Sequence, residues 1–291
     1  MNRRVVAQPR FTAEADGFTV VGAADELDDL ATLLAGRQEP VDTALAGRLD
    51  PAVHAADLFL PLGGGPTLVR VYQAEAGPRP LLLWLHGGGF VGGSVVDLDH
   101  PCSRLARSSG RTVVSLEYRL APEHPYPAAL DDTYDALCWL AEHGRVLGGD
   151  GRLAAGGQSA GGALVAGAVL RARDEGGPRL DRQVLCYPVV DVAAEPTWAE
   201  RQYLPGRPPV YAAPLRAGSL AGLPPTLVVA AGRDALRDQA EAYAGRLDDA
   251  DYVEYADTPH AFLNFCGVLS AGDHAVGVIS EFLSSPRPPS G

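Results

Sequence analysis

The sequence predicts an α/β protein with a mostly parallel, doubly wound sheet. Short apolar runs alternate with longer stretches of helical periodicity over about 200 residues, which is the pattern of repeated strand–helix units. Several of these runs lack the alternation of apolar and polar residues that marks a half-exposed strand, so we expect both faces of the sheet to be covered. In such sheets ligands bind beyond the carboxyl ends of the strands, and glycine-rich motifs directly follow two of the apolar runs.

The expected strands and helices follow one another in a regular order. An antiparallel pair at 57–60 and 68–72 comes first, because two apolar segments flank a glycine–proline turn. The later strands are expected at 81–85, 112–116, 153–155, 184–187, 226–231 and 252–255. The helices are expected at 98–109, 128–143, 160–174, 237–248 and 274–284. The strand near Tyr252 is expected at an edge of the sheet.

The chain divides into three parts by composition. Leucines recur at helical spacing among acidic residues between 25 and 35, which predicts one short amphipathic helix within residues 1–50. We expect this first part to form a small N-terminal cap on the α/β domain at 51–285, which carries the chemistry. The last residues, 286–291, are rich in proline and serine, and we predict that they form a disordered tail.

Composition and charge argue against several classes of function. The chain has 24 Lys and Arg against 36 Asp and Glu, a net charge of −12, whereas nucleic-acid binding needs clustered basic residues. No apolar run approaches the ~20 residues of a membrane-spanning helix, and no apolar stretch follows the basic N-terminus as in a secretory signal. The four cysteines form no CxxC pair, so we expect neither a metal site nor a disulfide framework. These features predict a cytoplasmic protein.

The strongest local motif is GQSAGG at residues 157–162, a G-x-S-x-G pattern. It follows an apolar run and precedes a helical stretch, the strand–turn–helix context in which Ser159 would be a nucleophile. So tight a turn strains the serine backbone, and Gly157 and Gly161 leave room for it. An ordinary glycine-rich turn would give the same local pattern, so other residues must decide between the two interpretations.

A second motif, HGGGF at residues 86–90, directly follows the apolar run at 81–85. Consecutive glycines let the backbone come close to a ligand and turn its N–H groups toward it. The N–H groups of Gly87, Gly88 and Ala160 would together form an oxyanion hole. A phosphate-binding glycine loop is the alternative, but the motif lacks the spacing of the known phosphate-binding patterns.

A nucleophilic serine needs a base, and the base needs an acid that orients it. His260 follows the strand expected at 252–255 and comes after the serine in the chain. Asp234 follows the strand expected at 226–231, and the order serine, acid, histidine is typical of this kind of site. Asp238 is the alternative acid, but it lies four residues farther along and is expected one helical turn away.

Six stretches of the chain together resemble one family, the hormone-sensitive-lipase-like branch of the α/β-hydrolases, a group of small bacterial carboxylesterases. They are HGGGF at 86–90, YRLAPEHPYPAA at 118–129, the serine motif at 157–162, YPV at 187–189, LPPT at 223–226 and HAF at 260–262. The resemblance covers about residues 68–285. The chain departs from the usual pattern at Gln158, Ala235 and Ala261, and its segments at 190–223 and 248–260 are short.

The resemblance implies an α/β-hydrolase fold and a serine carboxylesterase that needs no cofactor. Ser159 would be the nucleophile, His260 the general base and Asp234 the orienting acid, with the oxyanion hole at the glycines and Ala160 named above. The substrate would be a small-molecule ester, and the small cap favours short or medium acyl groups. Members of the family often pair through an edge strand or the last helix, so the resemblance also implies a homodimer.

The walls of the substrate pocket are less well marked in the sequence. Aromatic residues near glycine-rich and proline-rich loops are the candidates, namely Phe90, Trp198, Tyr203 and Tyr211. The scaffold alone does not fix the reaction, so a dedicated biosynthetic acyl hydrolase, an acyltransferase or an eliminating enzyme is an alternative. A ligand-binding relative without activity is a second alternative, against which the presence of His260 argues.

Overall fold

The computed structural model describes residues 1–7, 30, 33–34, 37, 47–191, 196–204, 206–266 and 268–285. The strands of this part are β1 (Asn2–Val6), β2 (His54–Leu62), β3 (Gly65–Gln73), β4 (Arg79–Leu85), β5 (Thr112–Leu116), β6 (Gly149–Gln158), β7 (Arg182–Cys186), β8 (Thr226–Arg233) and β9 (Ala250–Pro259). Its α-helices are α4 (Asp99–Ser109), α5 (Ala128–His143), α6 (Ala160–Glu175), α7 (Trp198–Tyr203), α8 (Arg237–Gly245) and α9 (Ser270–Ser284).

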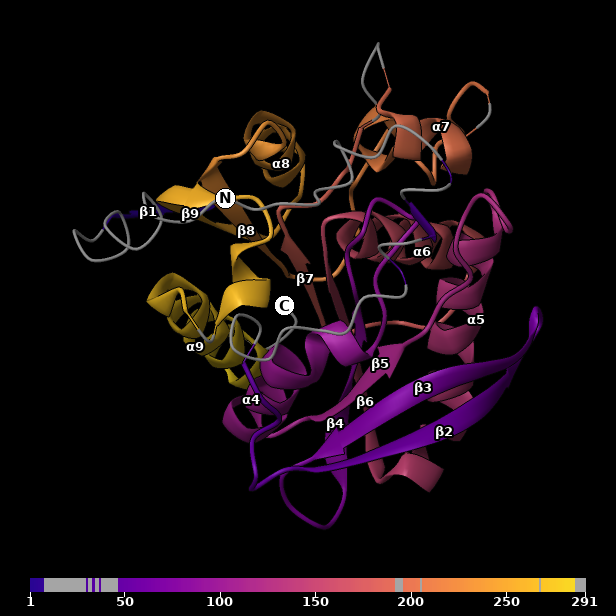
Figure 1. Cartoon of the computed structure of the whole chain (residues 1–291), viewed down its shortest axis with the longest axis vertical. Helices are drawn as coiled ribbons and strands as arrows, with labels where there is room; N and C mark the ends of the chain where they lie inside the picture. Colours follow the sequence, from indigo (N-terminus) through magenta and orange to yellow (C-terminus); the bar gives the residue numbers. More distant parts are fainter. Residues whose placement is uncertain are drawn as a thin grey trace.

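The strands form one sheet in the order β1-β9-β8-β7-β6-β4-β5-β3-β2 (Figure 1). In this spatial order, neighbouring strands run parallel from β1 through β9, β8, β7, β6 and β4 to β5. Strand β3 is antiparallel to both of its neighbours, β5 and β2. The predicted mostly parallel sheet with an antiparallel pair is therefore confirmed. The parallel strands bring their carboxyl ends to one rim of the sheet, where the loops after β4, β6, β8 and β9 meet.

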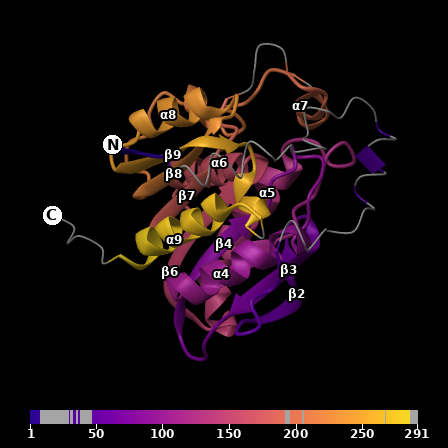
Figure 2. The ribbon, with the colours of Figure 1, turned by 60° about the vertical axis from the view of Figure 1, so that its left-hand side comes forward.

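Helices cover both faces of the sheet, which explains the uninterrupted apolar runs. Along β4, Leu81, Leu83 and Leu85 pack into one core with side chains of α5, α6 and α8. Leu82 and Trp84 point the other way, into a second core with α4 and α9. Helices α4 and α9 contact each other and lie together on that face (Figure 2). Because both faces of β4 are buried, its sequence has no polar alternation.

The edge of the sheet beyond β9 differs from the prediction. The strand that contains Tyr252 is not an edge, because β1 pairs with it in parallel, with Arg3 opposite Tyr252. Arg3 also forms ion pairs with Glu241 and Glu254, so charged contacts help to hold β1 against its neighbours. The strand was missed because its residues are mostly exposed and carry no apolar pattern.

Two sequence predictions fall largely outside the described residues. Of the helix predicted at 25–35, the structure describes positions 30, 33 and 34, and the side chain of Leu33 is buried in the larger core. The tail predicted at 286–291 lies wholly outside them. Among the helices that the structure describes, none is long and apolar enough to cross a membrane.

Candidate active site

Ser159 lies at the junction between the end of β6 and the start of α6. Its backbone has φ 53° and ψ −119°, a conformation that costs energy for a residue with a side chain. The turn is held from both sides, since the Ser159 N–H donates to the Cys186 carbonyl at 2.9 Å and its own carbonyl accepts from Ala163 at 3.0 Å. The serine side chain is thus presented on a fixed turn at the carboxyl rim.

Close backbone contacts explain the glycines of the serine motif. A Cβ atom at Gly157 would lie 2.6 Å from the carbonyl of Gly161. One at Gly161 would lie 2.2 Å from the carbonyl oxygen of His86, at the end of β4. No side chain fits at these distances, so both glycines are required for the start of α6 to pack against β4 and β6.

The structure brings His260 and Asp234 to the serine, as the sequence predicts. Nε2 of His260 lies 2.9 Å from Oγ of Ser159, and Nδ1 lies 2.7 Å from Oδ2 of Asp234. The other Asp234 oxygen accepts the N–H of Leu236 at 2.9 Å, and the carboxylate is only 4% exposed. An ionised carboxylate can only accept, so the imidazole carries its proton on Nδ1 and Nε2 is free to accept the serine proton.

The alternative acid, Asp238, does not reach the imidazole. It forms an exposed ion pair with the adjacent Arg237 on α8, and its side chain is 81% exposed. The distinction made from the sequence, between the residue at the end of a strand and the residue one turn later, is therefore supported by the geometry.

A buried aromatic residue packs beside the histidine. The Tyr187 ring meets the His260 ring edge-on, with centroids 5.0 Å apart, and its hydroxyl donates to Oε1 of Gln158 at 2.6 Å. Burial raises the pKa of Tyr187 well above its usual value, so the phenol stays neutral and keeps this hydrogen bond. Sequence reasoning gave Tyr187 no role, although its position directly after β7 was a usable signal.

The HGGGF loop lies directly beside the serine. A Cβ atom at Gly87 would be 3.2 Å from Cβ of Ser159. Gly88 has φ +117°, and its carbonyl accepts the N–H groups of Val91 and Gly92 at 3.1 and 2.9 Å, which closes the turn. Within the described residues, the N–H groups of Gly87 and Gly88 donate to no other residue. They are therefore available to a ligand beside Ser159.

A buried histidine supports this loop from behind. His86 stacks on Tyr118 with ring centroids 4.1 Å apart, and its Nδ1 lies 2.7 Å from the carbonyl of Gly87. The Tyr118 hydroxyl donates to the His86 carbonyl at 2.9 Å. Burial lowers the pKa of His86 to about 4, so its imidazole is neutral at neutral pH. The 118–129 segment thus braces the glycine loop.

Two carboxylates hold the segment that follows the loop, and sequence reasoning missed both. Glu117 accepts the N–H of Val95 at 2.8 Å, and Asp97 accepts the N–H of Ser94 at 2.7 Å. Burial raises the pKa of Glu117 and of Asp97. Their only sequence signal is the position of Glu117 directly after β5.

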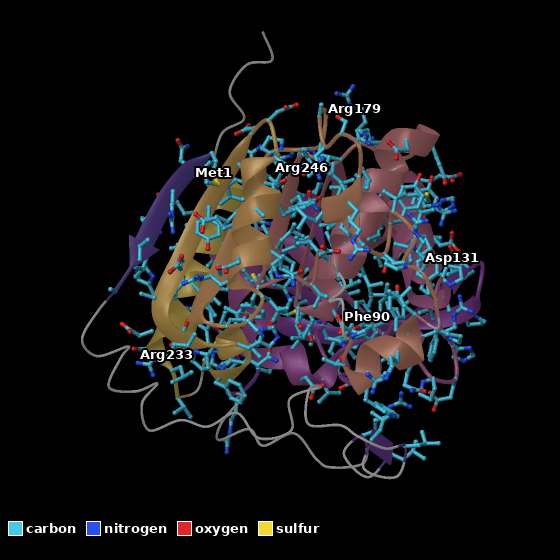
Figure 3. The ribbon with its side chains drawn as sticks, turned by 90° about the horizontal axis from the view of Figure 1, so that it is seen from above. Met1, Phe90, Asp131, Arg179, Arg233 and Arg246 are labelled. Carbon is cyan, nitrogen blue, oxygen red and sulfur yellow. The ribbon has the colours of Figure 1, made fainter. Side chains whose placement is uncertain are left out.

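The pocket candidates separate into two groups. Phe90 (Figure 3) has φ +67°, is buried, and stacks on Tyr203 with centroids 3.9 Å apart, which joins the glycine loop to α7. Trp198 is half-buried on the same helix, against the larger core. The Tyr211 hydroxyl instead lies 3.4 Å from Asp174, about 20 Å along α6 from its start at the serine. This contact places the Tyr211 hydroxyl near the far end of α6, away from Ser159.

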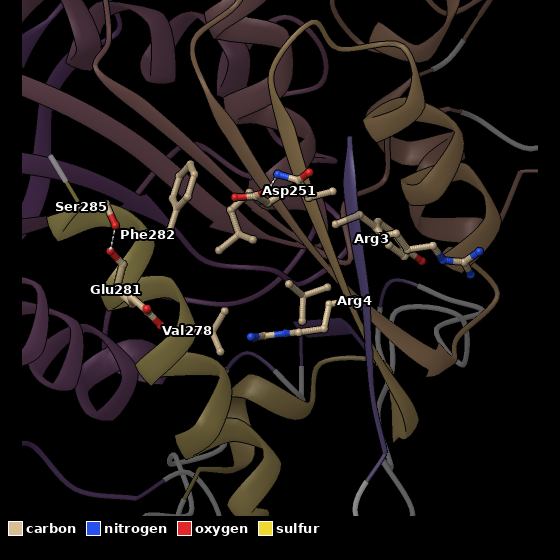
Figure 4. Close-up of a pocket in the computed structure, with 11 residues that line it drawn as sticks. Arg3, Arg4, Asp251, Val278, Glu281, Phe282 and Ser285 are labelled. Carbon is tan, nitrogen blue, oxygen red and sulfur yellow. Dashed lines mark hydrogen bonds between the residues drawn. The ribbon is translucent and has the colours of Figure 1, made fainter. Parts of the chain in front are cut away.

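One groove of about 320 Å³ lies elsewhere, between the β1–β9 edge and α9 (Figure 4). Arg4 extends into it from β1 toward Val278 of α9. None of its lining residues belongs to the site around Ser159. Among the described residues, no cluster of His, Cys, Asp and Glu has the arrangement of a metal site.

Comparison with known proteins agrees with this geometry. A family model described as alpha/beta hydrolase fold matches residues 82–264. This chain belongs to that family. Esterase LipI of Mycobacterium tuberculosis is 39% identical to this α/β-hydrolase over 258 residues, which cover 77% of this chain and 80% of the relative. Ethyl acetate hydrolase of Pseudomonas putida is 35% identical over 278 residues, which cover 84% and 87% of the two chains.

Solved structures of esterases share the architecture of this α/β-hydrolase. An esterase from Pyrobaculum calidifontis matches with a TM-score of 0.76 at 38% identity, over 87% of this chain and 89% of that one. A thermostable esterase from Pseudomonas putida ECU1011 matches with a TM-score of 0.82 at 28% identity, over 95% and 96%. The predicted hormone-sensitive-lipase-like membership and the class of carboxylic ester hydrolase are confirmed.

Proposed function

We propose that this chain hydrolyses carboxylic esters with short or medium acyl groups through a covalent acyl-enzyme on Ser159. The observation that supports the proposal most strongly is the hydrogen-bond chain from Ser159 through His260 to Asp234, with contacts of 2.9 and 2.7 Å. Each member comes from a different loop at the carboxyl rim, so an accidental arrangement of the three is a poor explanation.

In the first half-reaction, Oγ of Ser159 attacks the ester carbonyl carbon while its proton passes to Nε2 of His260. The carbonyl oxygen becomes an anion, which accepts hydrogen bonds from the N–H groups of Gly87, Gly88 and Ala160. Each such donor is typically worth a factor of ~10²–10³ in rate. Asp234 keeps the imidazole in the required tautomer and stabilises its positive charge.

The tetrahedral intermediate then collapses. The bond between the carbonyl carbon and the alcohol oxygen breaks, and His260 gives its proton to the departing alkoxide, so that the alcohol leaves and an acyl-serine remains. Water attacks this ester with His260 as the base, and the same N–H groups bind the second anion. Release of the acid restores the serine hydroxyl.

The size of the acyl group is inferred from the relatives and from the wall of the site. A relative of this chain is named an ethyl acetate hydrolase, which indicates a short acyl substrate for that protein. In this chain, the Phe90–Tyr203 stack fills space beside the glycine loop with buried side chains. We therefore expect acetate and butyrate esters to react faster than long-chain esters.

The test is turnover of p-nitrophenyl acetate by the parent and by Ser159→Ala. Loss of a triad nucleophile lowers kcat by about six orders of magnitude, so the variant should release p-nitrophenol far more slowly than the parent. Equal turnover by the two proteins would contradict the proposed nucleophile. If a fluorophosphonate labels the parent at Ser159 but the parent barely turns over simple esters, the result would instead favour a specialised acyl-transfer enzyme.

A cytoplasmic location and the pairing of two copies stay predictions. Among the described strands, β1 is the outermost at the β9 end of the sheet, so we expect a second copy to pair along its outer edge. Measurement of the mass in solution, for the parent and for a chain lacking residues 1–7, would test whether this edge is used.

A further inference from the structure

Among the described residues of the N-terminal segment, Arg37 contacts the turn that follows the glycine loop. Arg37 donates from Nε to the Val91 carbonyl at 2.7 Å and from Nη2 to the Ala121 carbonyl at 2.6 Å. Its Nη1 donates to the Glu123 carboxylate at 2.8 Å. The side chain is 20% exposed, although it lies more than fifty residues from each of its partners in the sequence.

Of the two carbonyls that Arg37 contacts, that of Val91 belongs to the turn that carries the glycines, and that of Ala121 belongs to a segment that is hydrogen-bonded to this turn. The Val91 N–H donates to the Gly88 carbonyl at 3.1 Å, and the Ala121 N–H donates to the Phe90 carbonyl at 3.0 Å. Val91 and Ala121 are buried to 1% exposure or less, so water has little access to their carbonyls. The guanidinium therefore completes the main-chain hydrogen bonding of the two residues whose N–H groups close the loop.

The geometry of the side chain suits this task. A guanidinium holds its N–H donors in a rigid planar fork, so contacts at three donors fix the relative positions of three acceptors. The main chain at Arg37 is itself anchored, because its N–H donates to the carbonyl of Leu33 at 3.0 Å. Leu33 is buried in the same core as Phe90 and Val91.

We propose that Arg37 is a positioning residue of the hydrolysis, which holds the Val91 and Ala121 carbonyls so that Gly87 and Gly88 keep their N–H groups directed at the anion. This role rests on the proposed function, since it assumes that the two glycines bind the oxyanion. Arg37 itself touches neither the substrate nor Ser159.

The first test compares Arg37→Ala with the parent on p-nitrophenyl acetate. Small displacements of groups that bind the transition state cost up to ~100-fold in rate, so we expect kcat to fall about 10- to 100-fold while KM changes less than about twofold. The second measurement is inhibition by a short alkyl trifluoromethyl ketone, which forms an anionic adduct with the serine. Its inhibition constant should rise by the same factor as kcat falls.

Two other variants separate positioning from general stability. Arg37→Lys keeps a charge but offers one compact ammonium group instead of the fork, so its kcat should lie between those of the parent and Arg37→Ala. If Arg37→Ala does not fold, the comparison of Arg37→Lys with the parent tests the proposal. Arg152→Ala removes an exposed arginine far from the loop and should leave kcat and inhibition unchanged.

An Arg37→Ala or Arg37→Lys protein that melts earlier but keeps the parent's kcat and inhibition constant would overturn the proposal. In the same assays Ser159→Ala shows which idea has failed. If that variant is inactive while the Arg37 variants match the parent, only the positioning role is lost. If it is active, the proposed function fails, and the role of Arg37 fails with it.

Discussion

The two rims of the sheet differ, because strained backbone lies at the carboxyl rim and a buried ion pair lies at the amino rim. Among the described residues, the non-glycine positions with positive φ are Phe90, Ser159, Tyr187 and Ala261. Each lies in the loop after a parallel strand, at the carboxyl rim. Positive φ strains the backbone of a residue with a side chain, and such strain persists only where the surrounding structure enforces it. Its concentration at one rim therefore marks the site of chemistry. At the amino rim, the buried side chain of Arg111 instead binds Asp181 and main-chain carbonyls.

The amino rim is held together by the hydrogen bonds of one buried arginine, Arg111. Arg111 is 3% exposed and binds both oxygens of Asp181, at 3.2 and 2.5 Å. It also donates to the carbonyl of Leu81 in β4 and to that of Leu283 near the end of α9. One side chain thus joins β4, the segments before β5 and β7, and the last helix. The comparison implies that changes at the carboxyl rim should alter rate, and changes at the amino rim should alter stability.

After Ser159→Ala, the largest expected effect is again on rate, at the carboxyl rim. Asp234→Asn keeps the shape of the side chain but can donate to Nδ1 of His260, which favours the wrong tautomer of the imidazole. A comparable substitution in a serine protease triad lowers kcat by ~10⁴, and we expect a loss of this order here, measured with p-nitrophenyl acetate.

Asp238→Asn is the matched control, because Asp238 lies on the exposed surface of α8 and does not reach the histidine. Its kcat should stay within about twofold of the parent's, since most exposed ion pairs contribute little. If the two asparagine variants lost activity equally, the assignment of Asp234 as the orienting acid would be wrong.

The next effect is on stability, at the amino rim. Arg111→Ala leaves Asp181 and two main-chain carbonyls without their donor, and removal of one partner from a buried pair costs about 3–5 kcal/mol. We expect urea unfolding to show a loss of this size, while kcat of the folded variant stays close to that of the parent. A large fall in kcat without a change in stability would contradict the division between the two rims.

A smaller effect, dependent on pH, connects stability to the glycine loop. The pKa of His86 is about 4 in the folded chain and near its usual value of ~6.5 in the unfolded chain, so the unfolded state takes up a proton first. Protonation of His86 therefore leaves the free energy of unfolding unchanged above pH ~6.5. As pH falls below that value it lowers the free energy of unfolding, by about 3 kcal/mol at pH 4. Stability measured from pH 7 to pH 4 should show this loss.

The comparison for that experiment is His86→Asn, whose side chain does not titrate. Glu117 and Asp97 have raised pKa values, so they favour the folded state as pH falls and partly mask the histidine. The difference between the parent and the variant isolates the imidazole, and it should change by about 3 kcal/mol between pH 7 and pH 4. Parallel curves for the two proteins would show that His86 is not buried as a neutral group.

The smallest effect is expected for an exposed pair. Arg152→Ala breaks a contact with Asp150 in which the arginine side chain is 63% exposed. Such pairs are worth about 0–1 kcal/mol, so urea unfolding should give a free energy within that range of the parent's value. A loss comparable to that of Arg111→Ala would mean that burial does not explain the importance of the amino rim.

The sequence predicted the fold and the three central residues because their signals are local. Apolar runs covered on both faces reveal parallel strands, and the glycines beside Ser159 are required by contacts of 2.6 Å or less. His260 and Asp234 could be found because each directly follows a strand. Reading each loop at the end of a strand was therefore enough to assemble the site.

The features that were missed depend on contacts between distant residues. β1 is held by its pairing with β9 and by ion pairs of Arg3, so it has no apolar pattern to detect. Glu117 matters because it accepts the N–H of Val95, 22 residues away, and Arg37 because of carbonyls 54 and 84 residues away. The contact of the Tyr211 hydroxyl with Asp174 could not be predicted either, because an aromatic residue in a loop does not reveal the direction of its ring.

The most direct measurement of the central claim is the reaction of the protein with a fluorophosphonate, followed by mass mapping of the adduct. We expect one adduct per chain, on the peptide that contains Ser159, with the rate of labelling greatly reduced in His260→Ala. Labelling at another serine, or labelling at Ser159 that proceeds equally fast without the imidazole, would contradict the account.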